Sequence, residues 1–143
     1  MTHQTILRPL MADVDAMGVV YYGKYLDFFE VGRAELMREA GGPYVRLRAE
    51  GLELPVTEAA LRYRRPARYD EPVVVQTTVA WLRKASMRFD YKLLRGEGPD
   101  RGQELVSGHT VHGCVDQAGR VRPLPAWVGQ VLALYLPSAE SWQ

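Results

Sequence analysis

The stretch DVDAMGVVYYGKYLDFFEVGR, which runs from Asp13 to Arg33, decides how this chain folds. Two aspartates one residue apart precede a glycine, two valines and two adjacent tyrosines. From Tyr25 onward, apolar residues recur at intervals of three and four, the spacing of one face of an α-helix. We predict one long helix that starts at Tyr25 and ends at Gly41 and Gly42, because glycine suits the left-handed turn that closes many helices.

The start of this helix has the features of an anion site. The first turn of a helix leaves backbone N–H groups without intrahelical acceptors and carries partial positive charge, so it can stabilise a developing oxyanion. Asp15 lies just upstream of that turn. The alternative is that Asp13 and Asp15 are solvated loop residues or caps, and the spacing leaves both interpretations open. Gly32, on the apolar face, indicates close packing of the helix against a neighbouring element.

A β-sheet is predicted to follow the helix. After Gly51, Val, Thr, Leu and aromatic residues recur between turn signals, and the helical periodicity is lost. The predicted strands cover residues 4–11, 54–65, 73–82, 86–94 and 104–115, and a second, shorter helix is predicted within 125–137. Tight turns join the later strands, which makes them antiparallel. The fold class is therefore α+β, with one long helix packed on a strongly curved antiparallel sheet.

The composition excludes several classes of protein. The chain has 18 Lys and Arg against 17 Asp and Glu, so no overall positive field attracts nucleic acid or an anionic membrane. Its 143 residues suit one domain, placed at 1–143, and no apolar run reaches the ~20 residues of a membrane span. The single cysteine, Cys114, cannot form an intrachain disulfide, and the N-terminus lacks the pattern of a signal peptide. We therefore expect a cytoplasmic protein.

Metal-dependent chemistry is not supported by the sequence. Read as a calcium loop, residues 13–24 place Met17 and Lys24 at positions that need oxygen ligands. His109 and His112 are three residues apart on a predicted strand, so their side chains point to opposite faces and are interpreted as structural. Ser107 does not lie in the glycine-flanked turn of a serine hydrolase. We predict no metal site.

Basic residues cluster in two places on the predicted sheet. The first cluster consists of Arg62, Arg64, Arg65 and Arg68, and the second of Arg83, Lys84 and Arg88. Each cluster can be a solvated sheet edge, where Lys and Arg protect strands from aggregation. Each can also hold phosphate groups, to which arginine offers a bidentate fork. The sequence pattern leaves both interpretations open.

Taken together, these features resemble the hot-dog fold acyl-CoA thioesterases of the 4-hydroxybenzoyl-CoA thioesterase type. The similarity rests on the block from Asp13 to Arg33, on LPVTEAALRYRRPARYDEPVVV from Leu54 and on WLRKASMRF from Trp81, and it spans nearly the whole chain. The resemblance implies a hot-dog fold, in which a curved antiparallel sheet wraps around one long helix. It also implies hydrolysis of a thioester to a free acid and CoA.

The resemblance further implies catalytic roles. In that family the second aspartate of the block is the catalytic carboxylate, which is Asp15 in this chain, acting as nucleophile or general base. A backbone N–H at the helix start holds the thioester oxygen, and it falls at Tyr22 or its immediate neighbours. Many relatives carry His at position 22 and Asn at the position of Lys24, so the resemblance implies no role for the Tyr22 side chain.

The substrate contacts are also implied by the resemblance. The loop with Arg83, Lys84 and Ser86 is similar to the segment that meets the nucleotide and phosphates of CoA. The further expected substrate contacts are Gly18, Val19, Tyr25 and Arg65. CoA enters as part of the substrate, and no separate cofactor is expected. In hot-dog proteins the active site lies at a dimer interface, so we expect a homodimer, which can pair again into a tetramer.

Two alternative functions share this fold. A noncatalytic module that binds acyl-CoA or an acyl carrier protein would use the same cleft without turnover. A hydratase of the same fold would need a histidine a few residues after its aspartate. No histidine follows Asp15 before His109, so the hydratase ranks last.

Overall fold

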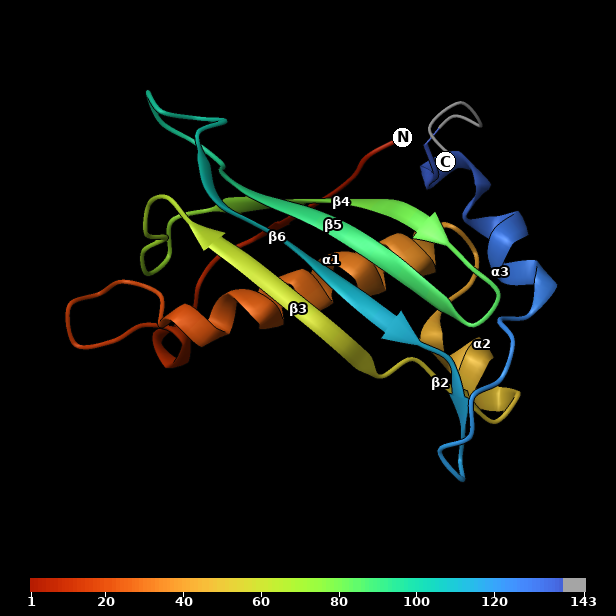
Figure 1. Cartoon of the computed structure of the whole chain (residues 1–143). Helices are drawn as coiled ribbons and strands as arrows, with labels where there is room; N and C mark the ends of the chain where they lie inside the picture. The colour runs from red at the N-terminus through yellow and green to blue at the C-terminus, as the bar shows by residue number, and fades with distance from the viewer. Residues whose placement is uncertain (138–143) are drawn as a thin grey trace.

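The structure, a computed structural model, describes residues 1–137 and consists of a long helix packed against a curved five-stranded sheet (Figure 1). Neighbouring strands are all antiparallel. Their order is β1 (His3–Leu7), β4 (Val73–Leu82), β5 (Ser86–Arg95), β6 (Glu104–Gly113) and β3 (Val56–Tyr63). The helices are α1 (Tyr25–Glu39), α2 (Tyr44–Ala49) and α3 (Ala126–Val131), with 3₁₀ turns η1 (Met11–Asp13), η2 (Tyr22–Lys24) and η3 (Ala133–Tyr135). A small second sheet pairs β2 (Leu52–Glu53) with β7 (Val115–Asp116).

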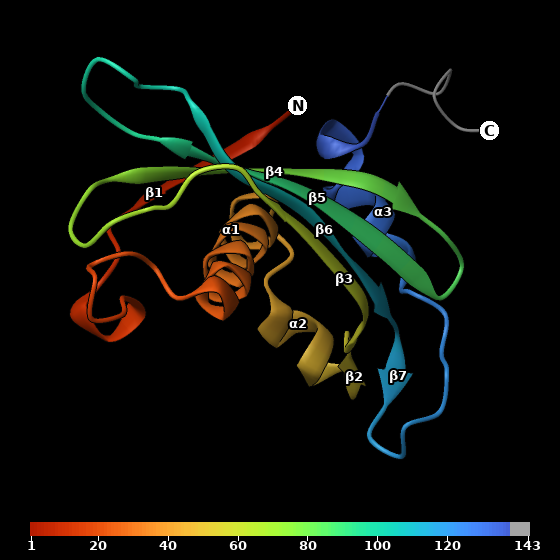
Figure 2. The same cartoon turned by 60° about the vertical axis from the view of Figure 1, so that its left-hand side comes forward.

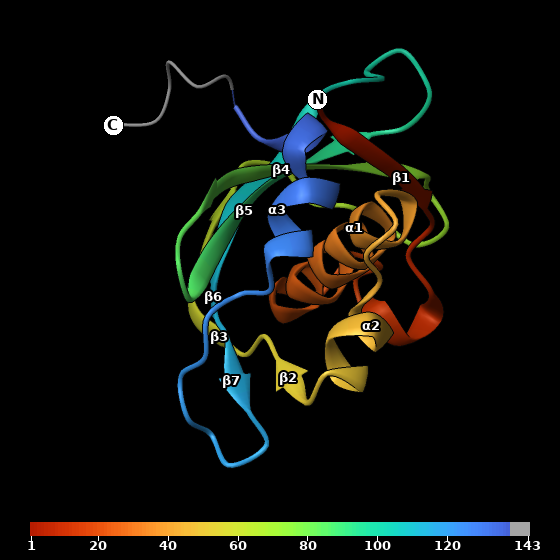
Figure 3. The ribbon, with the colours of Figure 1, turned by 90° about the vertical axis from the view of Figure 1, so that its right-hand side faces the viewer.

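Helix α1 lies in the concave face of the sheet, as Figures 2 and 3 show. Every second side chain along most of β4 and β5 is buried, which is the pattern of a sheet with one face in the core. Phe29 and Leu36 of α1 are completely buried, and the Phe29 ring stacks on Tyr91 with the ring centroids 4.5 Å apart. Helix and sheet therefore share one hydrophobic core. None of the helices within residues 1–137 combines the length and apolar character that a membrane crossing requires.

Gly32 sets the distance between α1 and the sheet. A Cβ atom at this position would lie 2.6 Å from both Val75 Cγ1 and Thr77 Oγ1, which is closer than real Cβ contacts. The absence of a side chain therefore lets the helix backbone rest directly on β4. The close approach predicted from a glycine on the apolar face is confirmed.

The predicted α+β class and most of its elements are confirmed. The long helix begins at Tyr25 as predicted and ends at Glu39, and Gly41 follows with a left-handed φ of +92°. The predicted antiparallel strands are present as β3, β4, β5 and β6. The short helix predicted near the C-terminus is α3, followed by η3.

Two of the predicted strand boundaries are wrong. The N-terminal strand, predicted to reach residue 11, ends at Leu7, because Pro9 has no N–H for the ladder and the chain turns into η1. The strand predicted over 104–115 breaks at Cys114, and β7 then leaves the main sheet to pair with β2. Strands of two residues are too short to produce a periodic pattern, so no sequence pattern predicts this pairing.

A hydrogen-bonded chain of polar side chains starts at the half-buried Arg33 and continues through buried residues of the core. It joins Arg33 Nη1 to Tyr91 Oη (3.5 Å), Tyr91 Oη to Thr110 Oγ1 (2.6 Å), and Thr110 Oγ1 to His112 Nε2 (2.8 Å). His112 Nδ1 lies 3.0 Å from the carbonyl oxygen of Leu54, which can only accept, so Nδ1 carries the proton. Burial lowers the pKa of His112 to about 4, so near pH 7 the ring is neutral and accepts at Nε2. Each bond therefore has a fixed direction, from Arg33 toward the Leu54 carbonyl.

We expect Gly32→Ala to lower the free energy of unfolding by about 1–3 kcal/mol, because the added methyl group pushes α1 away from β4. Gly129→Ala in α3 is the matched control, since a Cβ atom there meets only Leu82 Cδ1, at 4.0 Å. Alanine favours a helix over glycine, so the control variant should be unchanged or slightly more stable. Chemical denaturation checks both, and wild-type stability in Gly32→Ala contradicts the role given to this glycine.

The pKa of His112 also predicts a pH dependence of stability. In the unfolded chain the imidazole has its ordinary pKa near 6.5, so between about pH 6.5 and 4 the unfolded state binds more protons than the folded state. Stability contributed by this residue is present above pH 6.5 and is lost as the pH falls, by about 2 kcal/mol between pH 7 and 5.

Urea denaturation at pH 7 and pH 5 measures this loss. The variant His112→Gln should lack the His112 share of the pH dependence, whereas His109→Gln should retain it. His109 is a suitable control because it lies on the same strand but faces Glu58, 2.8 Å away, outside the core. An identical pH dependence in wild type and His112→Gln would show that His112 is not the group responsible.

Candidate active site

Asp15 lies in a tight loop before the helix start. Its carboxylate oxygen Oδ1 accepts hydrogen bonds from the backbone N–H groups of Met17 (2.8 Å) and Val19 (3.4 Å). The Asp15 N–H donates to the Val19 carbonyl at 2.9 Å, and the Gly18 N–H donates to the Asp15 carbonyl at 3.0 Å. Gly18 has a φ of +80°, which this turn requires. The side chain is exposed, and its other oxygen, Oδ2, has no hydrogen-bond partner among residues 1–137.

The two aspartates of the block have different roles. Asp13 Oδ2 accepts the Leu10 N–H at 2.8 Å, and the Asp13 carbonyl accepts the Tyr21 N–H at 2.9 Å. Asp13 is therefore a capping residue that shapes the loop. Asp15 is held by two amides through one oxygen only, which leaves the second oxygen available for chemistry.

The loop is fastened to the segment that joins β3 to β4. The Val20 N–H donates to the Ala67 carbonyl at 2.9 Å, and the Tyr69 N–H donates to the Gly18 carbonyl at 3.2 Å. Val20 and Ala67 are both buried, so the bond between them is shielded from water. Figure 1 shows the loop beyond the start of α1. Its position relative to the helix start is thus set by backbone hydrogen bonds.

The turn η2 leaves two backbone amides free at the helix start. The Lys24 N–H donates to the Tyr21 carbonyl at 2.9 Å and closes the turn. Within residues 1–137, the N–H groups of Tyr22 and Gly23 have no acceptor. Tyr63 Oη, from the end of β3, donates to the Tyr22 carbonyl at 3.0 Å. The free amides form the positive end of the helix, and Tyr63 fixes the peptide group to which one of them belongs.

A cleft of about 300 Å³ opens beside this helix start. Tyr22, Tyr25, Tyr63 and Arg65 are among the residues that line it. Tyr25 is nearly fully buried, and its hydroxyl accepts the Ala67 N–H at 3.0 Å. Burial raises the pKa of Tyr25, so the hydroxyl stays neutral. Arg65 makes no ion pair within residues 1–137 and offers a free positive charge at the cleft.

The structure brings together only some of the predicted site residues. The group at the helix start consists of Asp15, Gly18, Val19, Tyr22, Tyr25 and Arg65. Asp15 does not itself line the cleft, and Gly18 and Val19 serve chiefly to close the loop. The remaining three predicted residues, Arg83, Lys84 and Ser86, lie in and beside the β4–β5 turn.

The β4–β5 turn lies at the opposite end of the sheet from Asp15. Strand β4 begins at Val73, which pairs with Leu7 just before the Asp15 loop, and it runs for 10 residues. At about 3.3 Å per residue its two ends are ~30 Å apart. Within one chain, the turn with Arg83 therefore does not reach the helix start.

Two cations in this turn are available to bind a ligand. The Arg83 guanidinium lies over the Trp81 ring, 4.0 Å from its centroid. The backbone N–H of Arg83 donates to the Ser86 carbonyl at 2.8 Å. Neither Arg83 nor Lys84 forms an ion pair in the described part of the chain, and both are exposed. Arg88, by contrast, is engaged by Asp90 at 2.8 Å.

Sequence reasoning missed Tyr63 and Gly23 as parts of the site. Tyr63 showed only the alternation of a strand residue, and its contact with Tyr22 spans 41 positions. No local pattern signals such a pairing. As for metals, no group of three or more His, Cys, Asp or Glu residues gathers within residues 1–137.

Comparison with known families identifies the class of protein to which this geometry belongs. Residues 9–132 match the profile of the thioesterase-like superfamily, and the chain therefore belongs to that superfamily. This confirms the predicted family.

Individual relatives agree with this assignment. The acyl-CoA thioesterase YbgC of Haemophilus influenzae is 32% identical over 120 residues, which cover 82% of this chain and 83% of the relative. A 1,4-dihydroxy-2-naphthoyl-CoA hydrolase of Thermosynechococcus vestitus is 32% identical over 126 residues, covering 82% of each chain. The crystal structure of a hypothetical protein from Thermus thermophilus matches with a TM-score of 0.84 and 33% identity, covering 94% of this chain and 98% of that one. The predicted hot-dog fold is confirmed.

Proposed function

We propose that this protein, as one thioesterase-like domain over residues 1–143, hydrolyses an acyl-CoA to a free acid and CoA. The observations that carry the proposal are the one-sided hydrogen bonding of Asp15 in the loop just before the helix start and the two free amides of η2. A carboxylate with one free oxygen lies in a loop fastened beside a helix start with two free amides. This arrangement offers an attacking or proton-accepting group together with donors for an oxyanion.

The chemistry follows from these two groups. The thioester carbonyl oxygen accepts hydrogen bonds from the free amides of Tyr22 and Gly23, which stabilise the negative charge that develops as the carbon becomes tetrahedral. One such donor is typically worth about 2.7–4 kcal/mol in the transition state. Asp15 either attacks the carbonyl carbon directly or removes a proton from the attacking water. The thiolate of CoA leaves readily, so no strong general acid is needed.

A homodimer would complete this site. Within residues 1–137, strand β3 pairs only with β6 and its other edge is open, with Val56 and Tyr63 about half exposed. An open edge of this length is a template for pairing with a second copy. Antiparallel pairing of two β3 strands around a twofold axis places the Tyr63 end of one chain beside the Val56 end of the other.

This pairing also accounts for the position of the β4–β5 turn. The turn lies at the Val56 end of its own sheet, so the turn of the partner subunit comes toward the cleft beside Tyr22. Arg83 and Lys84 of the partner subunit can then bind the phosphates of CoA, with Ser86 of the partner subunit beside them. Arg65 contributes a further charge from the same chain as Asp15.

We expect Asp15→Asn to lower kcat for acyl-CoA hydrolysis by about 10²–10⁴-fold, because the amide can neither attack nor accept a proton efficiently. The side-chain oxygen still accepts the N–H groups of Met17 and Val19, so the loop should keep its shape. Asp13→Asn is the matched control, since its oxygen can still cap Leu10 and activity should persist. Free thiol release from a panel of acyl-CoAs measures both variants.

The outcomes of this assay separate the alternatives. Comparable rates for wild type and Asp15→Asn refute the role of Asp15. Binding of acyl-CoA without any turnover by the wild type identifies a noncatalytic acyl-CoA or acyl-carrier-protein binding module instead.

Tyr63→Phe should lower kcat several-fold and leave KM nearly unchanged. The Tyr22 carbonyl and the Gly23 N–H belong to one peptide group, so a hydrogen bond to that carbonyl orients the N–H and strengthens it as a donor. The effect should exceed that of Tyr69→Phe, an exposed tyrosine whose hydroxyl makes no hydrogen bond within residues 1–137. Steady-state kinetics on both variants, with melting temperatures to verify folding, check this. A change confined to KM would contradict the positioning role.

A further inference from the structure

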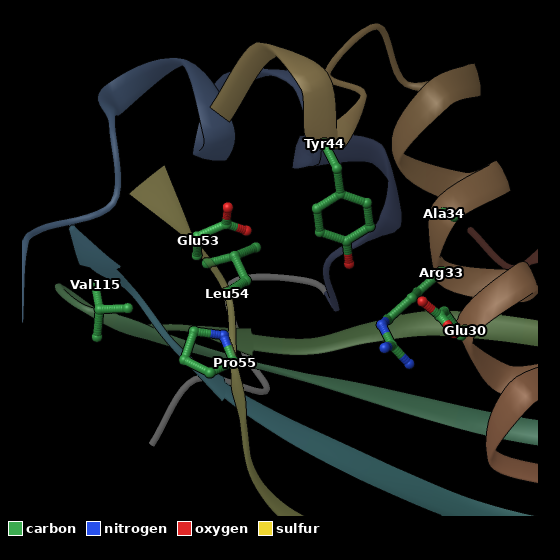
Figure 4. A pocket seen from close by; sticks show the side chains of 8 residues that line it. All are labelled: Glu30, Arg33, Ala34, Tyr44, Glu53, Leu54, Pro55 and Val115. Atoms are coloured by element: carbon green, nitrogen blue, oxygen red, sulfur yellow. The ribbon is translucent and has the colours of Figure 1, made fainter. Parts of the chain in front are cut away.

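A second cavity lies along α1, away from the helix start. It has a volume of about 430 Å³ and is bounded by α1, α2 and the segment that leads from β2 into β3 (Figure 4). Arg33 and Tyr44 face it from two different helices. Arg33 is eleven positions after Tyr22, which corresponds to about 16 Å along a helix at 1.5 Å per residue. Within one chain this cavity is therefore separate from the cleft beside Tyr22.

Two hydrogen-bond donors, Arg33 and Tyr44, face this cavity alongside the carboxylates of Glu30 and Glu53. The Tyr44 hydroxyl is buried and has no hydrogen-bond partner among residues 1–137. Arg33 lies close to the Tyr44 hydroxyl and favours its ionised form. Burial nevertheless raises the pKa of Tyr44 to about 12, so the hydroxyl stays protonated and can donate. A buried donor without an acceptor costs stability, and a ligand that accepts from it removes that cost.

The Arg33 guanidinium is also incompletely bonded. Within residues 1–137, its one hydrogen bond, to Tyr91 Oη, is 3.5 Å long, and it forms no ion pair. A guanidinium has five N–H donors, so most of its capacity is unused. The single long bond to Tyr91 leaves the other N–H groups of Arg33 available to a ligand in the cavity.

The other side chains that line the cavity indicate which further features a ligand there would have. Leu54, Pro55 and Val115 form an apolar side opposite Arg33, as Figure 4 shows. Two carboxylates are also present. Glu53 is engaged by Arg48, 3.2 Å away, and Glu30 is exposed, where solvent and salt weaken its repulsion of an anion.

We propose that this cavity binds an organic carboxylate with a small apolar body. The carboxylate accepts hydrogen bonds from Arg33 and Tyr44, and the apolar body lies against Leu54 and Val115. Such a compound can be a free acid or the far end of an acyl group that carries a second carboxylate. The second source rests on the proposed thioesterase function, whereas binding of a free acid does not.

Calorimetric titration of the full chain with sodium benzoate tests the proposal without any turnover. We expect saturable binding that Arg33→Gln weakens by roughly tenfold or more and Tyr44→Phe weakens several-fold. Tyr44→Phe should retain the wild-type melting temperature or exceed it, because the hydroxyl has no protein partner to lose. This variant keeps the test decisive if Arg33→Gln fails to fold.

Two further variants sharpen the titration. Arg38→Gln removes a charge from the same helix outside the cavity and should bind benzoate like the wild type. Glu30→Gln removes a like charge from the cavity and should bind benzoate more tightly. Absence of saturable binding by the wild type, or wild-type affinity in a folded Arg33→Gln or Tyr44→Phe variant, overturns the proposal.

A kinetic comparison distinguishes the two sources of the carboxylate. Thiol release is measured with hexadecanedioyl-CoA and with palmitoyl-CoA, which have the same chain length, long enough to span the ~16 Å along α1, but differ in the terminal carboxylate. A lower ratio of their kcat/KM values in Arg33→Gln shows that the cavity receives the end of the acyl group. An unchanged ratio with lost benzoate binding shows that it receives a free acid. If neither these two thioesters nor any acyl-CoA of the panel is cleaved, the proposed function fails, and the benzoate titration still decides whether the cavity binds a carboxylate.

Discussion

The packing of α1 directly on β4 is the constraint on which the rest of the structure depends. Because Gly32 carries no side chain, the helix lies against Val75 and Thr77 and buries Phe29 in the sheet. Because this packing fixes the position of α1 on the sheet, it also fixes the position of the N-terminal end of the helix. The free amides of η2 are therefore held in place by the core itself, and the Asp15 loop has only to be fastened nearby.

Different parts of the same helix serve different chemistry. The 3₁₀ turn η2 at its start offers unpaired amides, which are neutral donors at the positive end of the helix dipole. Two to three turns further on, Arg33 offers a full charge, supported from behind by Tyr91 and the polar chain that ends at Leu54. The neutral state of His112 gives that chain a single direction. The core thus contributes to the orientation of the Arg33 side chain as well as to the position of the helix on the sheet.

Local patterns in the sequence predicted most of the fold. The helical spacing after Tyr25, the alternation within the strands and Gly32 on the apolar face each depend on neighbours close in the chain. The candidate site was harder to predict from the sequence, because its contacts join segments that are far apart in the chain. Nothing near Tyr63 indicates that its hydroxyl meets Tyr22, and the pairing of β2 with β7 is too short to have a period.

The same limit applies to the roles of charged residues. Asp13 and Asp15 have equivalent positions in a sequence pattern, and only the loop geometry shows that Asp13 is a cap. The family resemblance assigns the basic turn with Arg83 and Asp15 to one site at a dimer interface, but no sequence pattern tells which chain supplies each. Whether two segments share a site depends on which ends of the strands they occupy, and that is a property of the whole sheet.

The length of β4 has one consequence for the behaviour of the enzyme. If a neighbouring chain holds the nucleotide half of the substrate and this chain holds the thioester, affinity and turnover both require association. Dilution that separates the subunits then removes both together, so the specific activity would itself rise with enzyme concentration. Each separated subunit would still carry Arg83 and Lys84, the residues proposed to bind the nucleotide, but ~30 Å from the thioester at its own helix start.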